Sequence, residues 1–145
     1  MNTVGCIRAR LGSTPYFIAK MTAGQLTDSV GFAMEMPEWE DMSPDEKMQR
    51  TLDVNRVVND IVPYIIDDED KFMGSLIVDI YQGFDDMTFE SVGDVFPTIP
   101  GAYKSSMKDM GFLSFPGNER LIALDGQHRL LALRIATVSY THLRA

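Results

Sequence analysis

Cysteine and histidine are almost absent from this sequence, which contains one cysteine and two histidines in 145 residues. A lone cysteine, Cys6, has no partner for an internal disulfide bond. One cysteine and two histidines are also too few for a typical metal-ligand cluster, so we expect no metal site. With ten methionines, this composition fits a protein of the reducing cytoplasm.

Long apolar runs are missing as well. No stretch approaches the roughly 20 apolar residues of a membrane-spanning helix, and no apolar segment near the N-terminus precedes a small-residue cleavage site. We therefore expect neither a membrane partner nor a signal peptide. Hydrophobic residues make up 45% and charged residues 23% of the sequence, which is ordinary for a globular protein, and the length suits one domain.

Positive charge is scarce, and the formal net charge of −8 argues against a protein that coats DNA uniformly. Residues 21–103 hold 4 basic and 18 acidic side chains, whereas residues 1–20 and 104–145 together hold 9 basic and 3 acidic ones. Two interpretations stay open: a solvated acidic face that maintains solubility, or basic ends that meet and face phosphates. Arg8 and Arg10, on one face of a predicted strand, either point into solvent or contact phosphate.

Hydrophobic periodicity predicts an α/β (α+β) fold, with helices packed on a small mixed sheet. The sequence Ser43-Pro44-Asp45-Glu46 has the pattern of a capping box with proline at the first helical position, and so predicts a helix start. An apolar stripe from Val54 to Ile65 predicts a second helix, kinked by Pro63. We expect this helix to pack on a central strand at Phe72–Tyr81.

The other segments are predicted from turn residues and alternation. Hairpins are expected at Val4–Leu11 with Tyr16–Met21, and at Gly111–Phe115 with Arg120–Asp125. Thr22–Met42 is expected to be a long acidic connection. Gln82–Lys108 is expected to be an insertion with one helical turn near Thr88–Val92.

The most informative stretch is Leu121–Ala136, where the hydrophobic period changes. A short apolar run typical of a buried strand ends at Asp125, and apolar residues then recur at helical spacing. Gly126 at the joint lets the backbone approach a phosphate, the helix start is positive, and Arg129 adds a fork of donors. The predicted phosphate- or nucleotide-binding residues are Asp125, Gly126, Gln127, His128 and Arg129.

Structural roles for the same residues stay open. Asp125 would serve as the helix N-cap, His128 would make an orienting hydrogen bond, and Arg129 would pair with Asp125 or another carboxylate. In an enzyme, His128 would instead be the general acid or base and Asp125 would hold a metal. One histidine and one aspartate fall short of a catalytic set.

The Asp-Gly-Gln-His-Arg motif, between strand and helix, resembles the signature of the DGQHR-domain family and its DndB members. More distantly, the layout resembles ParB and sulfiredoxin, in which a Gly-x-x-Arg turn grips nucleotide phosphates. The resemblance extends to Gln49-Arg50, Arg56, Tyr64-Ile65 and the Phe72-x-Gly74-Ser75 segment. It implies a ParB/sulfiredoxin-like fold and makes Arg50 and Arg56 secondary candidates for the site.

The resemblance to DndB implies a DNA-binding transcriptional regulator linked to DNA sulfur modification, or phosphorothioation. The alternative is an NTPase or nuclease of a DNA modification or defence system that uses the same turn. A nucleoside triphosphate is the candidate cofactor. DNA, a nucleotide and a second copy of the chain are the candidate partners.

The end of the chain departs from the family, whose DndB-like members continue for a second half. We therefore expect residues 1–137 to be the N-terminal part of a DGQHR domain that is incomplete at its C-terminus, and a third hypothesis is that such a piece binds nothing well. Residues 138–145 resemble a translated cloning adapter. We expect them to be a non-native tail, in which His142 and Arg144 carry no functional weight.

Overall fold

The computed structural model describes residues 2–139, except for the side chains of residues 49 and 50. The chain divides into two compact units, each made of two separate stretches. Residues 1–21 and 82–119 form unit 1, and residues 22–81 and 120–145 form unit 2. Both strands and helices are present, which confirms the predicted α/β class, and the strands are distributed over two sheets.

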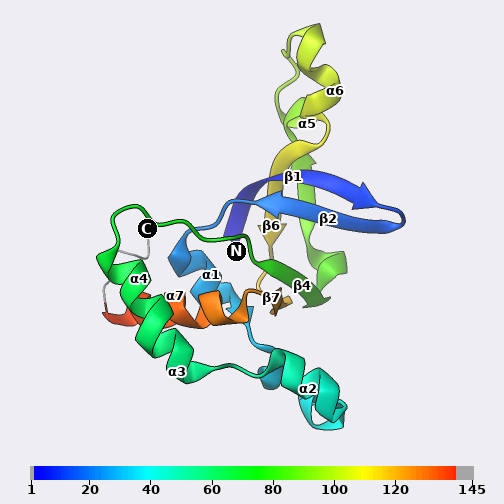
Figure 1. Ribbon diagram of the computed structural model, residues 1–145. Coiled ribbons are helices and arrows are strands. Elements are labelled where there is room, and N and C mark those ends of the chain that lie inside the picture. Colours follow the sequence, from blue (N-terminus) through cyan, green and yellow to red (C-terminus); the bar gives the residue numbers. More distant parts are fainter. Residues whose placement is uncertain (1, 140–145) are drawn as a thin grey trace. The chain divides into compact units, whose positions relative to one another are not determined.

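Unit 1 is built on a four-stranded antiparallel sheet with the order β2-β1-β6-β5. Its strands are β1 (Asn2–Leu11), β2 (Thr14–Ala19), β5 (Thr88–Ser91) and β6 (Met110–Phe115). Its helical segments are η4 (Phe84–Asp86), α5 (Val92–Val95), η5 (Gly101–Tyr103) and α6 (Lys104–Met107). The predicted first hairpin is confirmed as β1 and β2, and α5 and α6 lie together at one end of β5 and β6 (Figure 1).

Two predictions in unit 1 are wrong. Thr88–Ser91 is a strand rather than a helical turn, and the helix α5 begins only after Ser91, whose hydroxyl caps it. The second predicted hairpin does not form, because β6 has β1 on one side and β5 on the other. The strand that follows β6 in sequence, β7 (Arg120–Asp125), belongs to the sheet of unit 2.

Alternate side chains of β1 and β6 are buried in unit 1. Val4 lies opposite Leu113 in the register and both are almost completely buried, while the next inward residue of β1 is Cys6. Burial raises the pKa of the Cys6 thiol, so this group stays protonated at neutral pH. In the fold Cys6 is therefore a small core residue.

Unit 2 contains a three-stranded sheet with the order β3-β7-β4. Its outer strands are β3 (Val30–Gly31), which runs parallel to β7, and β4 (Ile77–Gln82). The central strand is therefore β7, whose Leu121, Ile122 and Ala123 are buried, and not the predicted strand at Phe72–Tyr81. Only the last part of that stretch is extended in the sheet.

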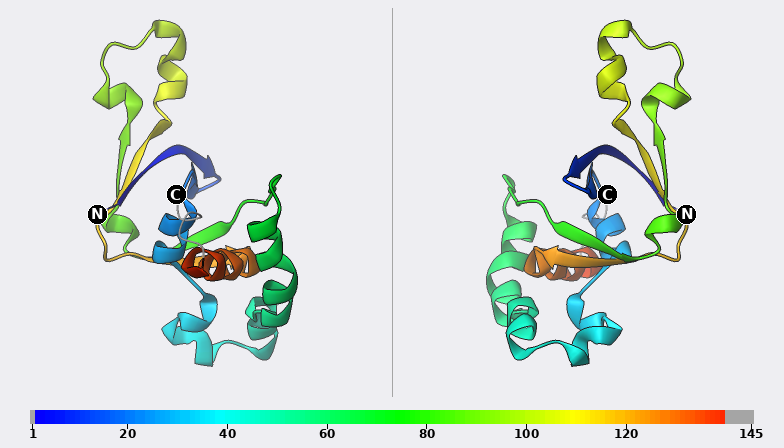
Figure 2. Two further views of the ribbon diagram at one scale, coloured as in Figure 1. Left: turned by 90° about the vertical axis from the view of Figure 1, so that its left-hand side faces the viewer. Right: turned by 90° about the vertical axis from the view of Figure 1, so that its right-hand side faces the viewer.

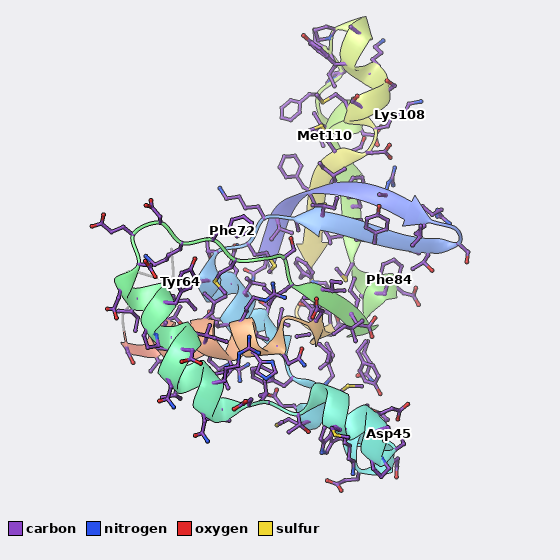
Figure 3. All side chains as sticks on the ribbon, viewed as in Figure 1. Asp45, Tyr64, Phe72, Phe84, Lys108 and Met110 are labelled. Carbon is purple, nitrogen blue, oxygen red and sulfur yellow. The ribbon has the colours of Figure 1, made fainter. Side chains whose placement is uncertain are left out.

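Tyr64 binds the backbone of Phe72, at the start of the predicted strand. Its hydroxyl accepts a hydrogen bond from the Phe72 N–H at 2.7 Å and donates one to the Phe72 carbonyl at 3.1 Å (Figure 3). The backbone groups that a neighbouring strand would pair are thus satisfied by a side chain. The Phe72 side chain is 85% exposed, so this apolar residue marks a loop and not a buried strand.

The helical segments of unit 2 cover most of its sequence. They are α1 (Ala23–Ser29), η1 (Ala33–Glu35), η2 (Pro37–Asp41), α2 (Pro44–Arg50), α3 (Val54–Arg56), the π-helical η3 (Val57–Ile61), α4 (Val62–Asp67) and α7 (Gln127–Ser139). The capping box of Ser43 with Glu46 at the start of α2 is confirmed. The prediction of a plain connection after Met21 is wrong, because Thr22 and Gln25 form a second capping box that starts α1.

The helix predicted from Val54 onward is present and is interrupted ahead of Pro63. Because Pro63 has no N–H, the Asn59 carbonyl loses its α-helical donor, and the backbone there takes up π-helical bonding. This helix packs mainly on α7, as Figures 1 and 2 both show, and Met73 of the predicted strand stretch borders the same core. The shared core consists of Val57, Ile65, Ala132 and Ala136.

No helix in the described part of the chain is long and apolar enough to cross a membrane. The last described residues, Val138 and Ser139, belong to α7, and the rest of the predicted tail lies outside the described residues.

Removal of residues 138–145 is expected to leave the melting temperature unchanged within about 2 °C, because Val138 is 76% exposed. Removal of residues 136–145 should lower it clearly, since Ala136 and Thr137 are both buried. Differential scanning calorimetry of the two shortened proteins against the parent checks this. A clear loss after the shorter deletion would show that the tail packs natively.

Candidate functional site

The DGQHR segment forms the predicted strand–turn–helix in unit 2. Strand β7 ends at Asp125, Gly126 takes a φ of +86°, and α7 begins at Gln127. The Leu130 N–H donates to the Gly126 carbonyl at 2.9 Å, which is the first bond of the helix. Gly126 is required here because side chains disfavour this backbone conformation.

Arg129 folds back over the start of its own helix. A Cβ atom on Gly126 would lie 2.9 Å from Nη2 and 3.2 Å from Nε of Arg129, and a Cβ atom on Gly74 would collide with Nη1. The guanidinium therefore lies against the backbone of two glycines, one in the turn and one in the loop before β4. A side chain at either glycine would displace it.

The nearest carboxylate to this guanidinium belongs to Asp125. Its Oδ2 lies 3.8 Å from Nη2 of Arg129, and the two side chains are 67% and 28% exposed. This is the ion pair that the structural interpretation predicts, but at 3.8 Å and with an exposed carboxylate it contributes little to stability.

His128 connects the turn to the helix of unit 2 that starts at Val54. Its Nε2 accepts a hydrogen bond from the Asp53 N–H at 2.9 Å, and the Asp53 carboxylate caps α3 by accepting from the Arg56 N–H at 3.1 Å. A ring nitrogen that accepts is unprotonated, so the proton of the neutral ring lies on Nδ1. With Nε2 accepting this bond, His128 makes the orienting hydrogen bond of the structural interpretation.

The structure describes the remaining predicted site residues in different detail. Gln127 is half-buried at the first position of α7. Arg56 is exposed on α3, three residues after the Asp53 that His128 holds, so the fold brings it to the same part of unit 2. Arg50 is the last residue of α2, and its side chain lies outside the described part of the structure.

Two residues that the sequence did not single out as functional complete the site. Gly74 forms one wall of the slot for Arg129, and Asp53 links His128 to α3. Gly74 belongs to the Phe72-x-Gly74-Ser75 segment of the family resemblance, and this resemblance could have indicated a role for it. No pattern in the sequence points to Asp53 as the partner of a histidine 75 residues away.

The charges around the turn nearly balance. Arg56 and Arg129 are offset by Asp53 and Asp125, so affinity for an anion would depend on directed donors more than on net charge.

Among the described residues, no group of three or more His, Cys, Asp or Glu side chains is arranged to hold a metal ion. Elsewhere in unit 2, a hydrogen bond with Glu38 raises the pKa of Tyr81.

Comparison with known proteins identifies a family. The family model described as DndB, DNA-sulfur modification-associated, matches residues 4–144. No curated protein and no solved structure matches the chain.

Proposed function

We propose that this chain binds DNA as a regulator of DNA sulfur modification. The basis is its family: the chain belongs to the DndB family of DNA-sulfur-modification-associated proteins. The DGQHR turn is its candidate contact with the DNA backbone. The observation that carries the proposal is the Arg129 guanidinium, held against Gly126 at the start of a 13-residue helix.

The turn offers two kinds of donor to a phosphate. The N–H groups of His128 and Arg129 lie ahead of the first helical bond, at the positive end of the α7 dipole. The guanidinium supplies charge-assisted donors, which bind phosphate oxygens more strongly than neutral groups do. Because Gly126 has no side chain, the Arg129 guanidinium can lie against the turn and present its donors at the helix start.

The pairing of Arg129 with Asp125 does not oppose this role. The carboxylate is 67% exposed and 3.8 Å away, so little free energy is lost when a phosphate replaces it as the partner of the guanidinium. Arg56 provides a second, exposed cation on α3, whose start is fixed by the hydrogen bond between Asp53 and His128. We therefore expect the Arg56 side chain to contact the same strand of DNA.

Arg129→Ala is expected to weaken binding of a short DNA duplex by about 10- to 100-fold, the equivalent of one charge-assisted contact. Arg129→Lys should recover only part of the loss, because an ammonium group lacks the guanidinium fork. Isothermal titration calorimetry with the duplex, and separately with ATP, measures both variants and shows which phosphate ligand the turn prefers.

The matched control is Arg120→Ala, which removes the same charge from the opposite end of β7. It should bind the duplex within about twofold of the parent. Melting temperatures should be similar for all variants, because the Arg129–Asp125 pair is long, at 3.8 Å, and its carboxylate is exposed. Equal duplex affinity of the parent and Arg129→Ala would mean that the turn is structural and that DNA is bound elsewhere.

A further inference from the structure

Unit 1 contains a polar hollow on the β1–β2 hairpin. It is lined by Arg8, Ala9, Arg10, Pro15 and Asp109. Arg10 lies opposite Pro15 in the register of the two strands, and Arg8 lies opposite Phe17. Because they are two residues apart on one strand, both arginines point to the same face of the sheet, with their Cα atoms roughly 7 Å apart.

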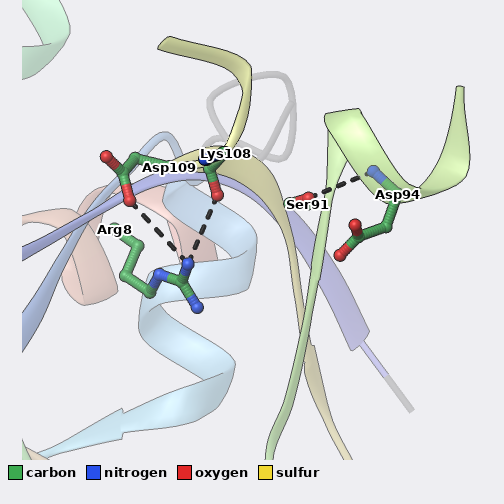
Figure 4. Close-up of polar contacts among 5 residues, drawn as sticks. All are labelled: Arg8, Ser91, Asp94, Lys108 and Asp109. Carbon is green, nitrogen blue, oxygen red and sulfur yellow. Dashed lines mark hydrogen bonds and ion pairs between the residues drawn. The ribbon is translucent and has the colours of Figure 1, made fainter. Parts of the chain in front are cut away.

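Arg8 is held in place by neighbours from strand β5 and from the turn before β6. Its guanidinium carbon lies 4.5 Å from the centre of the Phe89 ring, and Nη2 donates to the Lys108 carbonyl at 3.3 Å. The same Nη2 lies 3.8 Å from Oδ1 of Asp109, and both contacts are drawn in Figure 4. Because both polar contacts of the Arg8 side chain within the described residues use Nη2, the Nη1 and Nε donors remain available to an acceptor in the hollow.

Arg10 has no ion pair or side-chain hydrogen bond in the part of the chain that the structure describes. It is exposed, and the one carboxylate among the residues lining the hollow is that of Asp109, which is itself 59% exposed and paired loosely with Arg8. Two guanidinium groups thus face one carboxylate, which leaves an excess of positive charge and of directed donors.

We propose that this hollow binds a phosphate group. A phosphate presents several oxygens to the donors of Arg8 and Arg10, and planar guanidinium groups match that geometry better than an ammonium does. Stacking on Phe89 orders Arg8 before binding, so less conformational entropy is lost when the phosphate arrives. The assignment of that phosphate to a DNA backbone rests on the proposed function, whereas the binding of phosphate itself does not.

Titration of the full-length protein with inorganic phosphate tests the hollow directly. The Nε–Hε signals of Arg8 and Arg10 should shift and saturate in NMR spectra with sodium phosphate, and should not do so with sodium chloride at equal ionic strength. If neither signal responds to phosphate, the proposal is wrong. If both respond while the parent protein binds no DNA duplex, the hollow is a phosphate site and the proposed function fails.

Duplex binding then identifies the source of the phosphate. Arg10→Gln should weaken binding by about three- to tenfold and lower the slope of log K against log salt by about 1. Lys104→Gln is the matched control, because it removes one positive charge from unit 1 outside the hollow. An effect of Arg10→Gln no larger than that of Lys104→Gln would assign the hollow to free phosphate.

Asp109→Asn is a test in which the affinity for phosphate should rise and not fall. The substitution keeps the size of the side chain and removes the negative charge from the hollow, so phosphate should bind about two- to fivefold more tightly. A purely structural role for the Arg8–Asp109 pair predicts a lower melting temperature and no gain in affinity. The absence of any gain in phosphate affinity would contradict the proposal.

Discussion

Val57→Asp is expected to lower the free energy of unfolding of unit 2 by about 4 kcal/mol, enough to unfold a marginal domain. The Val57 side chain is completely buried against α7, next to Ala132 and Ala136. A carboxylate at this position would lose its hydration without gaining a partner. Urea denaturation followed by circular dichroism measures the loss.

The neighbouring residue supplies the control for this substitution. Val58 belongs to the same π-helical segment but is 48% exposed, so Val58→Asp should cost less than about 1 kcal/mol. The pair of variants separates burial from any effect on helix propensity. Similar losses for both would mean that the packing of η3 on α7 is not what stabilises unit 2.

Gly126→Val is expected to destabilise unit 2 by about 3 kcal/mol or more, for two reasons that add. The positive φ of +86° is unfavourable for a residue with a side chain, above all a β-branched one. The new Cβ would also lie 2.9 Å from Nη2 of Arg129 and 3.0 Å from Cγ of Leu76. Thermal unfolding gives the loss of stability, and duplex binding of the folded fraction should fall with it.

A second pair of variants separates backbone strain from crowding. Gly12 also has a positive φ, of +61°, but a Cβ there would meet nothing within 4 Å. Gly12→Ala therefore reports the backbone cost alone, about 1–2 kcal/mol, and Gly126→Ala should exceed it. If the two alanine variants lose equal stability, the crowding of the turn by Leu76 and Arg129 has no energetic consequence.

The parts of the fold that the sequence predicted are those determined by near neighbours. The change of period at Gly126 and the capping box at Ser43 each involve only a few consecutive residues. The predicted hairpin of β6 with β7 failed because strand pairing is not local. Asn2 of β1 pairs with Phe115 of β6, and Val30 of β3 pairs with Leu121 of β7. The residues between β6 and β7 contain no pattern that predicts those partners.

The candidate site also has a part that near neighbours in the sequence predict and a part that they do not. Gly126 and Arg129 follow from the spacing of one motif, and the structure places them together. Asp53 and Gly74 reach the turn from distant parts of the sequence, so no local pattern predicts their contacts with His128 and Arg129. The helix start at Thr22 was predictable, since its capping box with Gln25 is visible in the sequence.

The division of each unit into two stretches has a consequence for synthesis on the ribosome. Val57 and Ile65 are made early, but their partners on α7 emerge only after the whole second stretch of unit 1, residues 82–119. Until then, an apolar helix face is exposed in the nascent chain and is prone to aggregate or to bind chaperones. The β1–β2 hairpin needs no such delay, so it can form first, whereas the core of unit 2 closes only after α7 has been synthesised.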